Sequence, residues 1–317
     1  MIKLGIVMDP IKFINIKKNS TFFIMLEAQR YGCQIYYMEM NDLYFEQGIA
    51  MANSRILTLQ ENLKIWYTFH SKQTIELSEL NIILMRKDPP FNTEYIYATY
   101  ILEHAERKGT LVINKPQSLR DCNEKIFTTW FPELTPATLV TSSSEKIKAF
   151  QKRHGEIILK PLDSMGGASV FRITKNALNL PVIIEILTKN GNNYVMAQAF
   201  IPEIANGDKR ILIINGEVIP YCLARIPAYG EIRANLAIGG IAEARTLNET
   251  DIKIAESVSP VLKEKGLIFV GLDIIGDKLT EINVTSPTCI REIELAFNIS
   301  ITRKFMDVLL SLIEKQG

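Results

Sequence analysis

The first 122 residues alternate between short apolar runs and amphipathic stretches. Apolar runs bounded by charged or turn residues indicate buried strands, whereas apolar positions three or four apart indicate helices. Strands that alternate with helices in this way predict a doubly wound parallel sheet, whose ligands bind at the carboxyl ends of the strands. The expected strands are 2–8, 33–40, 81–85 and 110–114, and the expected helices are about 20–30 and 93–108.

The pattern changes beyond residue 122. Asp121 and Glu124 have the spacing of a capping box, which predicts a helix that begins there. A small α+β unit then runs to about 200, and a further unit contains a hairpin with an Asn-Gly turn at 215–216. The segment 226–245 shows no periodicity, which is typical of a functional loop. We therefore predict three units, 1–122, 123–200 and 201–317.

The stretch GLDIIGDKLTEINVTSP at 271–287 predicts a hairpin with acids in its middle. A two-residue turn at Gly276-Asp277 would place Asp273 opposite Thr280. A three-residue loop, 276–278, would place Asp273 opposite Glu281 and would leave the other face almost entirely apolar, so we expect this loop.

Two facing carboxylates repel each other unless a cation lies between them, and oxygen ligands suit Mg²⁺. Asp273, Glu281 and Asn283 are therefore candidate metal ligands, with Gly271 clearing space for Asn283. The alternative is the solvated face of an edge hairpin.

Several positions indicate a site for phosphate or carboxylate groups. The Gly-rich turn DSMGGAS at 163–169 could cover phosphates with its amides, although most such turns are simple hairpins. Lys160 ends an apolar run, and Lys125 lies in the first turn of the expected helix, where a cation is disfavoured. A bound polyphosphate would explain both lysines, and a solvated surface position is the alternative for each. Arginine is suited to bidentate binding of such anions, and candidates at strand ends or in the long loop are Arg86, Arg210, Arg225 and Arg233.

The overall charge is nearly balanced, with 36 Lys and Arg against 35 Asp and Glu, so it gives no argument for a nucleic-acid partner. The four cysteines are far apart and form no metal-ligand spacing, which favours reduced thiols. No apolar run approaches the roughly 20 residues of a membrane-spanning helix. We expect a cytoplasmic protein without a membrane or nucleic-acid partner.

Long segments of the chain resemble the prokaryotic glutathione synthetases, a family of the ATP-grasp superfamily. They include KLGIVMDP, LMRKDPPF, NKPQSLRDCNEK, ILKPLDSMGGAS, GDKR, YCLARIP and the hairpin with the residues after it. The resemblance covers essentially the whole chain. It implies an N-terminal α/β domain with a doubly wound parallel sheet, followed by an ATP-grasp fold that is partly α+β. It also implies ATP as co-substrate, Mg²⁺ or Mn²⁺, and ligation of γ-glutamylcysteine to glycine through an acylphosphate by a homotetramer.

The resemblance also implies roles for individual residues. Arg210, Arg225 and Arg233 would act in catalysis. Arg86, Ser286 and Thr288 would bind substrate, and the 226–242 loop would cover the intermediate. The ATP-binding residues would be Lys125, Lys160, Ser164, Met165, Gly166, Gly167, Gln198, Ala199, Ile201 and Asp208, and the metal ligands Asp273, Glu281 and Asn283.

The chain departs from the family pattern in the mobile loop, where Tyr229 and Ala234 occupy glycine-type positions and Ile241 follows a double glycine. The alternatives are an ATP-grasp carboxylate–amine ligase for other substrates and an ATP-binding regulatory protein without turnover. RKDPPF and the other long segments favour glutathione synthetase over the first. The complete set of metal ligands favours turnover over the second.

Overall fold

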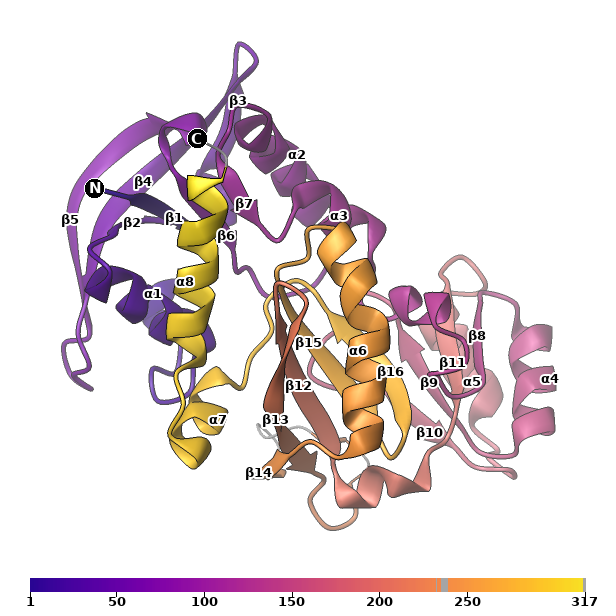
Figure 1. Cartoon of the computed structure of the whole chain (residues 1–317). Helices are drawn as coiled ribbons and strands as arrows, with labels where there is room; N and C mark the ends of the chain where they lie inside the picture. The colour runs from indigo at the N-terminus through magenta and orange to yellow at the C-terminus, as the bar shows by residue number, and fades with distance from the viewer. Residues whose placement is uncertain (232, 235–238, 316–317) are drawn as a thin grey trace.

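The computed structural model describes residues 1–231, 233–234 and 239–315, and its strands form three sheets in chain order (Figure 1). The first sheet lies within 3–113, the second within 138–199 and the third within 208–283. The second sheet projects to one side, whereas the first and third are joined by the C-terminal helix. The division into units at 122 and 200 stays a prediction.

The first sheet has a parallel centre, as expected, and an antiparallel extension that the sequence pattern did not indicate. Strands β2, β1, β6 and β7 pair in parallel in that order, and β4 adds to β2 in the opposite direction. The long strand β5 was missed because only Ile75 among its ten residues is buried, so no apolar alternation is visible. The strands are β1 (Lys3–Val7), β2 (Gln34–Met38), β3 (Leu43–Glu46), β4 (Ile49–Leu59), β5 (Tyr67–Glu76), β6 (Ile82–Met85) and β7 (Leu111–Ile113).

The two longer helices of the first unit, α1 and α2, begin at asparagine caps. Asn19 accepts a hydrogen bond from the amide of Phe22, and Asn92 does the same for Tyr95, which satisfies amides at each helix start. Apolar contacts place α1 and α2 against opposite faces of the sheet. The helices are α1 (Ser20–Arg30), α2 (Thr93–Arg107) and α3 (Pro116–Asp121).

The helix predicted to begin at Asp121 is wrong, because α3 ends at that residue. The chain continues into a short 3₁₀ helix, Ile126–Trp130. Asn123 makes the capping contacts instead, since its side chain accepts hydrogen bonds from the amides of Lys125 and Ile126. Lys125 therefore precedes a 3₁₀ turn and does not lie inside an α-helix.

The second unit has a hydrophobic core of its own, formed by residues between 147 and 197. Its sheet is antiparallel in the order β10-β9-β11-β8, with two helices packed against it. A unit with a separate core can move as a body relative to its neighbours. Its elements are β8 (Thr138–Thr141), α4 (Ser144–His154), β9 (Ile157–Pro161), β10 (Phe171–Ile173), α5 (Leu180–Thr188) and β11 (Val195–Ala199).

The third sheet is antiparallel in the order β14-β13-β12-β15-β16. The predicted Asn215-Gly216 turn joins β12 to β13, and both residues have positive φ, as a two-residue hairpin turn requires. Helix α6 packs on β12, β13 and β15. The elements are β12 (Asp208–Ile214), β13 (Glu217–Ile226), β14 (Ile241–Thr246), α6 (Glu249–Glu264), β15 (Phe269–Ile275), β16 (Lys278–Asn283), α7 (Ile290–Phe297) and α8 (Ile301–Glu314).

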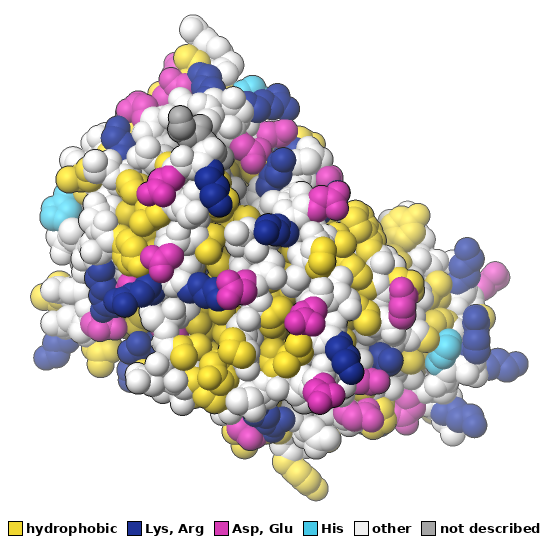
Figure 2. All heavy atoms as spheres, viewed as in Figure 1, with side chains coloured by type: hydrophobic (Ala, Val, Ile, Leu, Met, Phe, Trp, Pro, Cys, Tyr) yellow, Lys and Arg dark blue, Asp and Glu magenta, His cyan; other side chains and the backbone are white. Residues whose placement is uncertain are grey.

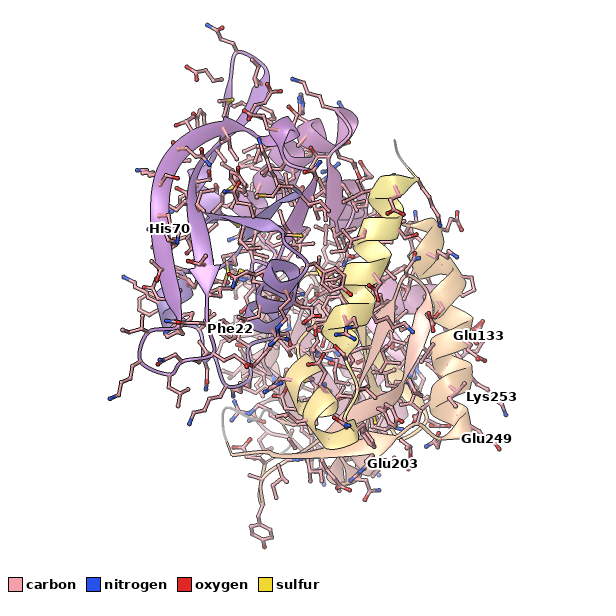
Figure 3. The ribbon with its side chains drawn as sticks, turned by 60° about the vertical axis from the view of Figure 1, so that its left-hand side comes forward. Phe22, His70, Glu133, Glu203, Glu249 and Lys253 are labelled. Carbon is pink, nitrogen blue, oxygen red and sulfur yellow. The ribbon has the colours of Figure 1, made fainter. Side chains whose placement is uncertain are left out.

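Helix α8 lies between the first and third sheets and packs against both α1 and β12 (Figures 1 and 3). Phe305 and Leu309 on α8 belong to the same buried cluster as Ile24 of α1 and Leu212 of β12. The C-terminal helix therefore completes the core of the N-terminal unit. Within the described part of the chain, no helix combines the length and the apolar character needed to cross a membrane.

Candidate active site

The β15–β16 hairpin has a two-residue turn, because Ile275 pairs with Lys278. The predicted loop of residues 276–278 is therefore wrong. The register shifts next to Asp273, and this shift leaves Thr280 outside the ladder as a β-bulge. Beyond the bulge Asp273 lies opposite Glu281, and Gly271 lies opposite Asn283. The expected pairing of the acids is confirmed, but a bulge produces it rather than a longer loop.

Thr280 uses the bulge to connect two sheets. Its hydroxyl donates to the carbonyl of Asp273 at 3.1 Å, and its own carbonyl accepts a hydrogen bond from Lys160 Nζ at 3.3 Å. Lys160 comes from β9 of the second sheet, so the predicted phosphate-binding lysine reaches the predicted metal hairpin. Burial lowers the pKa of Lys160 to about 8.

Asp273 is held by two arginines from neighbouring strands. Arg210 on β12 lies opposite Asp273 in the ladder and binds it in a bidentate manner, at 2.5 Å through Nε and 3.0 Å through Nη2. Arg225 on β13 reaches Asp273 at 2.9 Å and Asp208 at 2.6 Å. Burial by itself would raise the pKa of Asp273, but the two guanidinium groups outweigh it and hold that pKa below its ordinary value.

Glu281 is paired with Lys125, whose ammonium lies 2.9 Å from Oε1 and also donates to the carbonyl of Ser164 at 2.7 Å. Lys125 is only 4% exposed. Burial acts to lower its pKa, but the adjacent carboxylate of Glu281 outweighs this effect and raises it. Each of the two facing carboxylates therefore has its own protein cation.

Gly271 makes room for Arg210 rather than for Asn283. A Cβ at this position would lie 2.8 Å from Cδ of Arg210 and 3.3 Å from Cβ of Pro287. The Asn283 amide instead donates to the Gly271 carbonyl at 3.2 Å. The sequence-based explanation of this glycine is corrected accordingly.

The donor set fits a hard divalent cation that is also bound by phosphate. Among the described residues, no three His, Cys, Asp or Glu side chains gather as metal ligands. Mg²⁺, however, is commonly held by one or two carboxylates together with substrate phosphates. The pair with Lys125 engages Oε1 of Glu281, and no described residue donates a hydrogen bond to Oε2. Nearby, Oδ1 of Asp208 is buried without a partner in the described chain, so the region offers acceptor atoms to a ligand.

The strand predicted to face adenine ends in backbone groups that differ in their contacts. The amide of Ala199 donates to the carbonyl of Ala137 and is not available to a base. The carbonyl of Ile201 accepts from Ile204, whereas no described residue accepts a hydrogen bond from the Ile201 amide. Gln198, which precedes them, is buried and bonded to Thr138 at 3.1 Å.

The turn 163–169 lies against the long loop between β13 and β14. Gly166 and Gly167 have φ of 65° and 76°, and a Cβ on Gly167 would lie 3.3 Å from Cδ of Arg233. Ser164 donates to Ala168, and Met165 is 49% exposed.

The three arginines predicted to act in catalysis lie apart. Arg233 pairs with Glu231 at 3.1 Å, whereas Arg210 and Arg225 both contact Asp273. Residues 232 and 235–238 of the expected 226–242 cover lie outside the described residues.

The predicted substrate-binding residues join the first sheet to the hairpin. Arg86 is 6% exposed and donates to the carbonyl of Pro287 at 2.7 Å and to the hydroxyl of Thr21 at 3.1 Å. Ser286 donates to Asp88 at 2.5 Å, and Thr288 accepts from Arg210 at 3.4 Å. The segment 286–288 therefore contacts Arg86 and Asp88 of the first unit and also Arg210 of the third sheet.

Two residues that shape the site were missed at the sequence level. Oε1 of Glu124 accepts hydrogen bonds from the amides of Val284 and Thr285, both at 2.9 Å, and so fixes the chain after β16. Asn114 donates to the carbonyls of Phe269 and Val284 at 2.8 Å and 2.6 Å and accepts from the Phe269 amide at 2.9 Å. Asn114 directly follows β7 and therefore lies at the ligand edge of the sheet, which is a signal that could have identified it.

Comparisons with known proteins agree along the whole chain. Residues 2–120 match the prokaryotic glutathione synthetase N-terminal domain, and residues 124–298 match the prokaryotic glutathione synthetase ATP-grasp domain. The glutathione synthetase of Vibrio vulnificus (strain YJ016) is 70% identical over 98% of this chain and 97% of that protein. The glutathione synthetase of Escherichia coli (strain K12) is 61% identical over 100% of both. The fold is similar to that of D-cycloserine synthetase DcsG, with a TM-score of 0.68, 15% identity and coverage of 99% and 100%.

Proposed function

Because the chain belongs to the prokaryotic glutathione synthetase family, we propose that it joins γ-glutamylcysteine to glycine with the free energy of ATP. It is an ATP-grasp ligase, and its reaction class is the ligation of a carboxylate to an amine. The observation that best supports this activity is the meeting of Lys125 and Lys160 with the Asp273–Glu281 pair, where the second and third sheets adjoin. Cations and acids together at that point suit a metal-bound polyphosphate.

The reaction proceeds in two steps. A carboxylate oxygen of the cysteinyl residue attacks the γ-phosphorus of ATP, and ADP leaves. The amine of glycine then attacks the carbonyl carbon of the acylphosphate, a proton is released from the nitrogen, and phosphate leaves. Neither step needs a side-chain nucleophile, so the work of the protein is to position the groups and to offset their charge.

The proposed ATP-binding roles are those that the family resemblance implies, and the contacts support them. Lys125 and Lys160 bind phosphates, and the turn with Ser164, Met165, Gly166 and Gly167 closes over them. Gln198 supports the strand on which the Ala199 carbonyl and the Ile201 amide face adenine. Asp208, whose buried Oδ1 has no hydrogen-bond partner among the described residues, binds the ribose.

Asp273, Glu281 and Asn283 would hold Mg²⁺ or Mn²⁺ together with ATP phosphates. Such an ion would offset charge on the transferring phosphoryl group. For Asp273 to bind a cation, its bidentate contact with Arg210 must loosen. Arg210 and Arg225 are then free to bind the negative charge of the acylphosphate, with Arg233 approaching from the loop above the Gly-rich turn.

The substrate carboxylate that reacts is placed by the segment 286–288. Ser286 and Thr288 face the substrate, and Arg86 fixes this segment through the Pro287 carbonyl. The 226–242 loop covers the acylphosphate, and exclusion of water protects it from hydrolysis.

The wider cellular setting follows the family. Charged side chains of both signs are intermingled on the face shown in Figure 2, which gives no support for a nucleic-acid partner. The proposed setting is a cytoplasmic homotetramer with three units, 1–122, 123–200 and 201–317, in each chain.

A coupled assay of ADP release tests the activity. We expect release only when ATP, γ-glutamylcysteine, glycine and Mg²⁺ are all present, with glutathione as the product. Release with other carboxylates or amines but not with this pair would instead indicate a ligase of different specificity. Binding of ATP without any turnover would reject the enzyme in favour of a regulatory protein.

A further inference from the structure

Three consecutive residues, Asn123, Glu124 and Lys125, lie where the second and third units meet. They follow α3 and precede the 3₁₀ helix Ile126–Trp130, so they belong to the connection between the first two sheets. Each of their side chains nevertheless bonds to a residue at least 39 positions away. Connecting segments normally run over the surface in contact with solvent. The contacts of the segment 123–125 therefore indicate a role beyond joining two units.

Asn123 holds the start of the Gly-rich turn. Its Nδ2 donates to the carbonyl of Leu162 at 3.0 Å, and Leu162 directly precedes the turn 163–169. Its Oδ1 accepts hydrogen bonds from the amides of Lys125 and Ile126 at 3.1 Å and 3.0 Å. The start of the turn is thus anchored by a side chain that is itself held in place by two hydrogen bonds.

Glu124 holds the end of β16 through its backbone and its side chain. Its backbone carbonyl accepts from the amide of Ile282 at 2.9 Å. Its Oε1 accepts from the amides of Val284 and Thr285, each at 2.9 Å, and from the Thr285 hydroxyl at 2.8 Å. Asn283 lies between these anchored residues. Glu124 therefore determines where this predicted metal ligand stands.

The space beside Glu124 is too small for a substrate group. The cavity there has a volume of about 10 Å³ and is lined by residues of all three units, among them Pro89, Leu162 and Thr285. A cavity of this volume holds about one water molecule. Glu124 thus acts on the site through the chain that it anchors, which makes it a positioning residue.

We propose that the segment 123–125 sets the position of the Gly-rich turn relative to the metal ligands, given the function proposed above. Its first residue fixes the turn and its second fixes Asn283. Its third, Lys125, contacts both sides, through the carbonyl of Ser164 and the carboxylate of Glu281. The turn covers the phosphates that share the metal with the hairpin, so the two must keep one relative position. A misplacement of about 1 Å can cost about 100-fold in rate.

A double-mutant cycle between Asn123→Ala and Glu124→Ala tests this connection. The first variant releases the turn and the second releases the chain around Asn283, so either one already loses the fixed relative position. We expect each to raise the Kd of the Mn²⁺ complex of a non-hydrolysable ATP analogue about 10-fold, and to lower kcat about 10-fold to 100-fold. The double variant should lie within about threefold of the more affected single variant. Independent anchors would instead multiply their effects, and that result would overturn the proposal.

Glu124→Gln separates the hydrogen bonds of Glu124 from its charge. Glutamine keeps an acceptor for the amides of Val284 and Thr285, so kcat and Kd should return to within about fivefold of the parent protein. Thr285→Val removes only the hydroxyl contact and should have a smaller effect than Glu124→Ala. A glutamine variant as impaired as the alanine variant would overturn the proposal, because charge rather than position would then be responsible.

Glu133→Ala and Asn193→Ala are the matched controls, since both residues are exposed in the second unit. Both variants should keep the Kd and kcat of the parent protein. A purely structural role would lower the unfolding midpoint of Asn123→Ala and Glu124→Ala and leave their Kd and kcat unchanged, and this result would also overturn the proposal. A parent protein that binds the Mn²⁺ complex but releases no ADP would reject the proposed function, whereas the cycle measured in Kd would still decide the role of the segment.

Discussion

Asp273 lies directly opposite Glu281 in the β15–β16 ladder, yet each carboxylate is neutralised by a cation from a different part of the chain. Arg210 on the adjacent strand binds Asp273, and Lys125 from the segment before the second sheet binds Glu281. These cations offset the repulsion between the two carboxylates, so both can lie side by side without a bound ligand. A metal ion that enters must compete with these contacts, so binding of the metal and release of the side chains are coupled.

Glu281→Gln tests the metal assignment. The amide retains an acceptor for Lys125, so the fold should remain intact, but the charge that a divalent cation requires is lost. We expect the rate of ADP release to fall about 100-fold or more, since a bound metal contributes several kcal/mol to phosphoryl transfer. The thermal unfolding midpoint should fall, because the buried ammonium of Lys125 loses the carboxylate that offsets its charge, while the protein remains folded at the assay temperature.

Glu133→Gln is the matched control, because Glu133 is exposed and lies near the outer edge of the molecule in Figure 3. Calorimetric titration with Mn²⁺ in the presence of a non-hydrolysable ATP analogue gives a second readout. Near-normal turnover together with near-normal Mn²⁺ binding in Glu281→Gln would remove Glu281 from the metal site.

Gly271→Ala tests the position of Arg210. The added Cβ would lie 2.8 Å from Cδ of Arg210, so the guanidinium must move away from Asp273. Overpacking of this kind typically costs about 1–3 kcal/mol of folding free energy, and we expect at least about a tenfold loss of kcat. Urea unfolding and steady-state kinetics measure the two effects. Wild-type kcat in this variant would show that catalysis does not depend on the position that Gly271 allows the Arg210 side chain to take.

Asn114→Ala tests the connection between the first and third sheets. The side chain makes three hydrogen bonds across that junction, and the substitution leaves buried backbone groups of Phe269 and Val284 without partners. We expect a loss of about 2–4 kcal/mol in the free energy of unfolding, measured by urea denaturation. Asn114→Asp keeps the acceptor for the Phe269 amide but places a carboxylate against two carbonyls, so it should be no more stable than the alanine variant.

Glu292→Gln tests a half-buried carboxyl outside the site. Burial raises the pKa of Glu292, and within the described chain its Oε2 atom has no partner. A carboxyl with a raised pKa holds its proton in the folded state at pH values where the unfolded chain has lost it. Its contribution to folding stability is therefore largest at low pH and falls as the pH rises through the raised value.

The glutamine variant should remove this pH-dependent part of the stability. We expect it to be more stable than the parent protein by about 1 kcal/mol near pH 7.5 and to lose this advantage toward pH 4. The difference between the unfolding free energies of the two proteins across that range is the measurement. A difference that is constant with pH would show that Glu292 does not titrate as described.

The sequence pattern predicted those elements whose burial leaves a periodic signal. The alternation of apolar runs and helices indicated the parallel strands β1, β2, β6 and β7, and the Asn-Gly pair indicated the β12–β13 turn. Strand β5 gave no such signal because nearly all of its residues are at least partly exposed. Asp121 and Glu124 have residue types that suit a capping box. Tertiary contacts decide whether a helix begins there, and in the structure α3 ends at Asp121.

The hairpin shows why register is harder to predict than residue faces. The apolar face required Asp273 opposite Glu281, and that requirement was correct. A longer loop and a bulge both satisfy it, and only the contacts of Thr280 with Asp273 and Lys160 decide between them. The contact with Lys160 joins residues 120 positions apart, and contacts between residues distant in the sequence leave no local pattern. For the same reason the pairing of Arg210 and Arg225 on one carboxylate could not be predicted from their positions alone.

Helix α8 has a consequence for the synthesis of the chain. A ribosome that has made the first sheet and α1 has not yet made Phe305 and Leu309, which fill the same core as Ile24. The apolar surface beside α1 therefore stays uncovered during translation until almost the whole chain has emerged. The nascent N-terminal unit must remain soluble through that interval, either by holding a looser packing or by binding a chaperone.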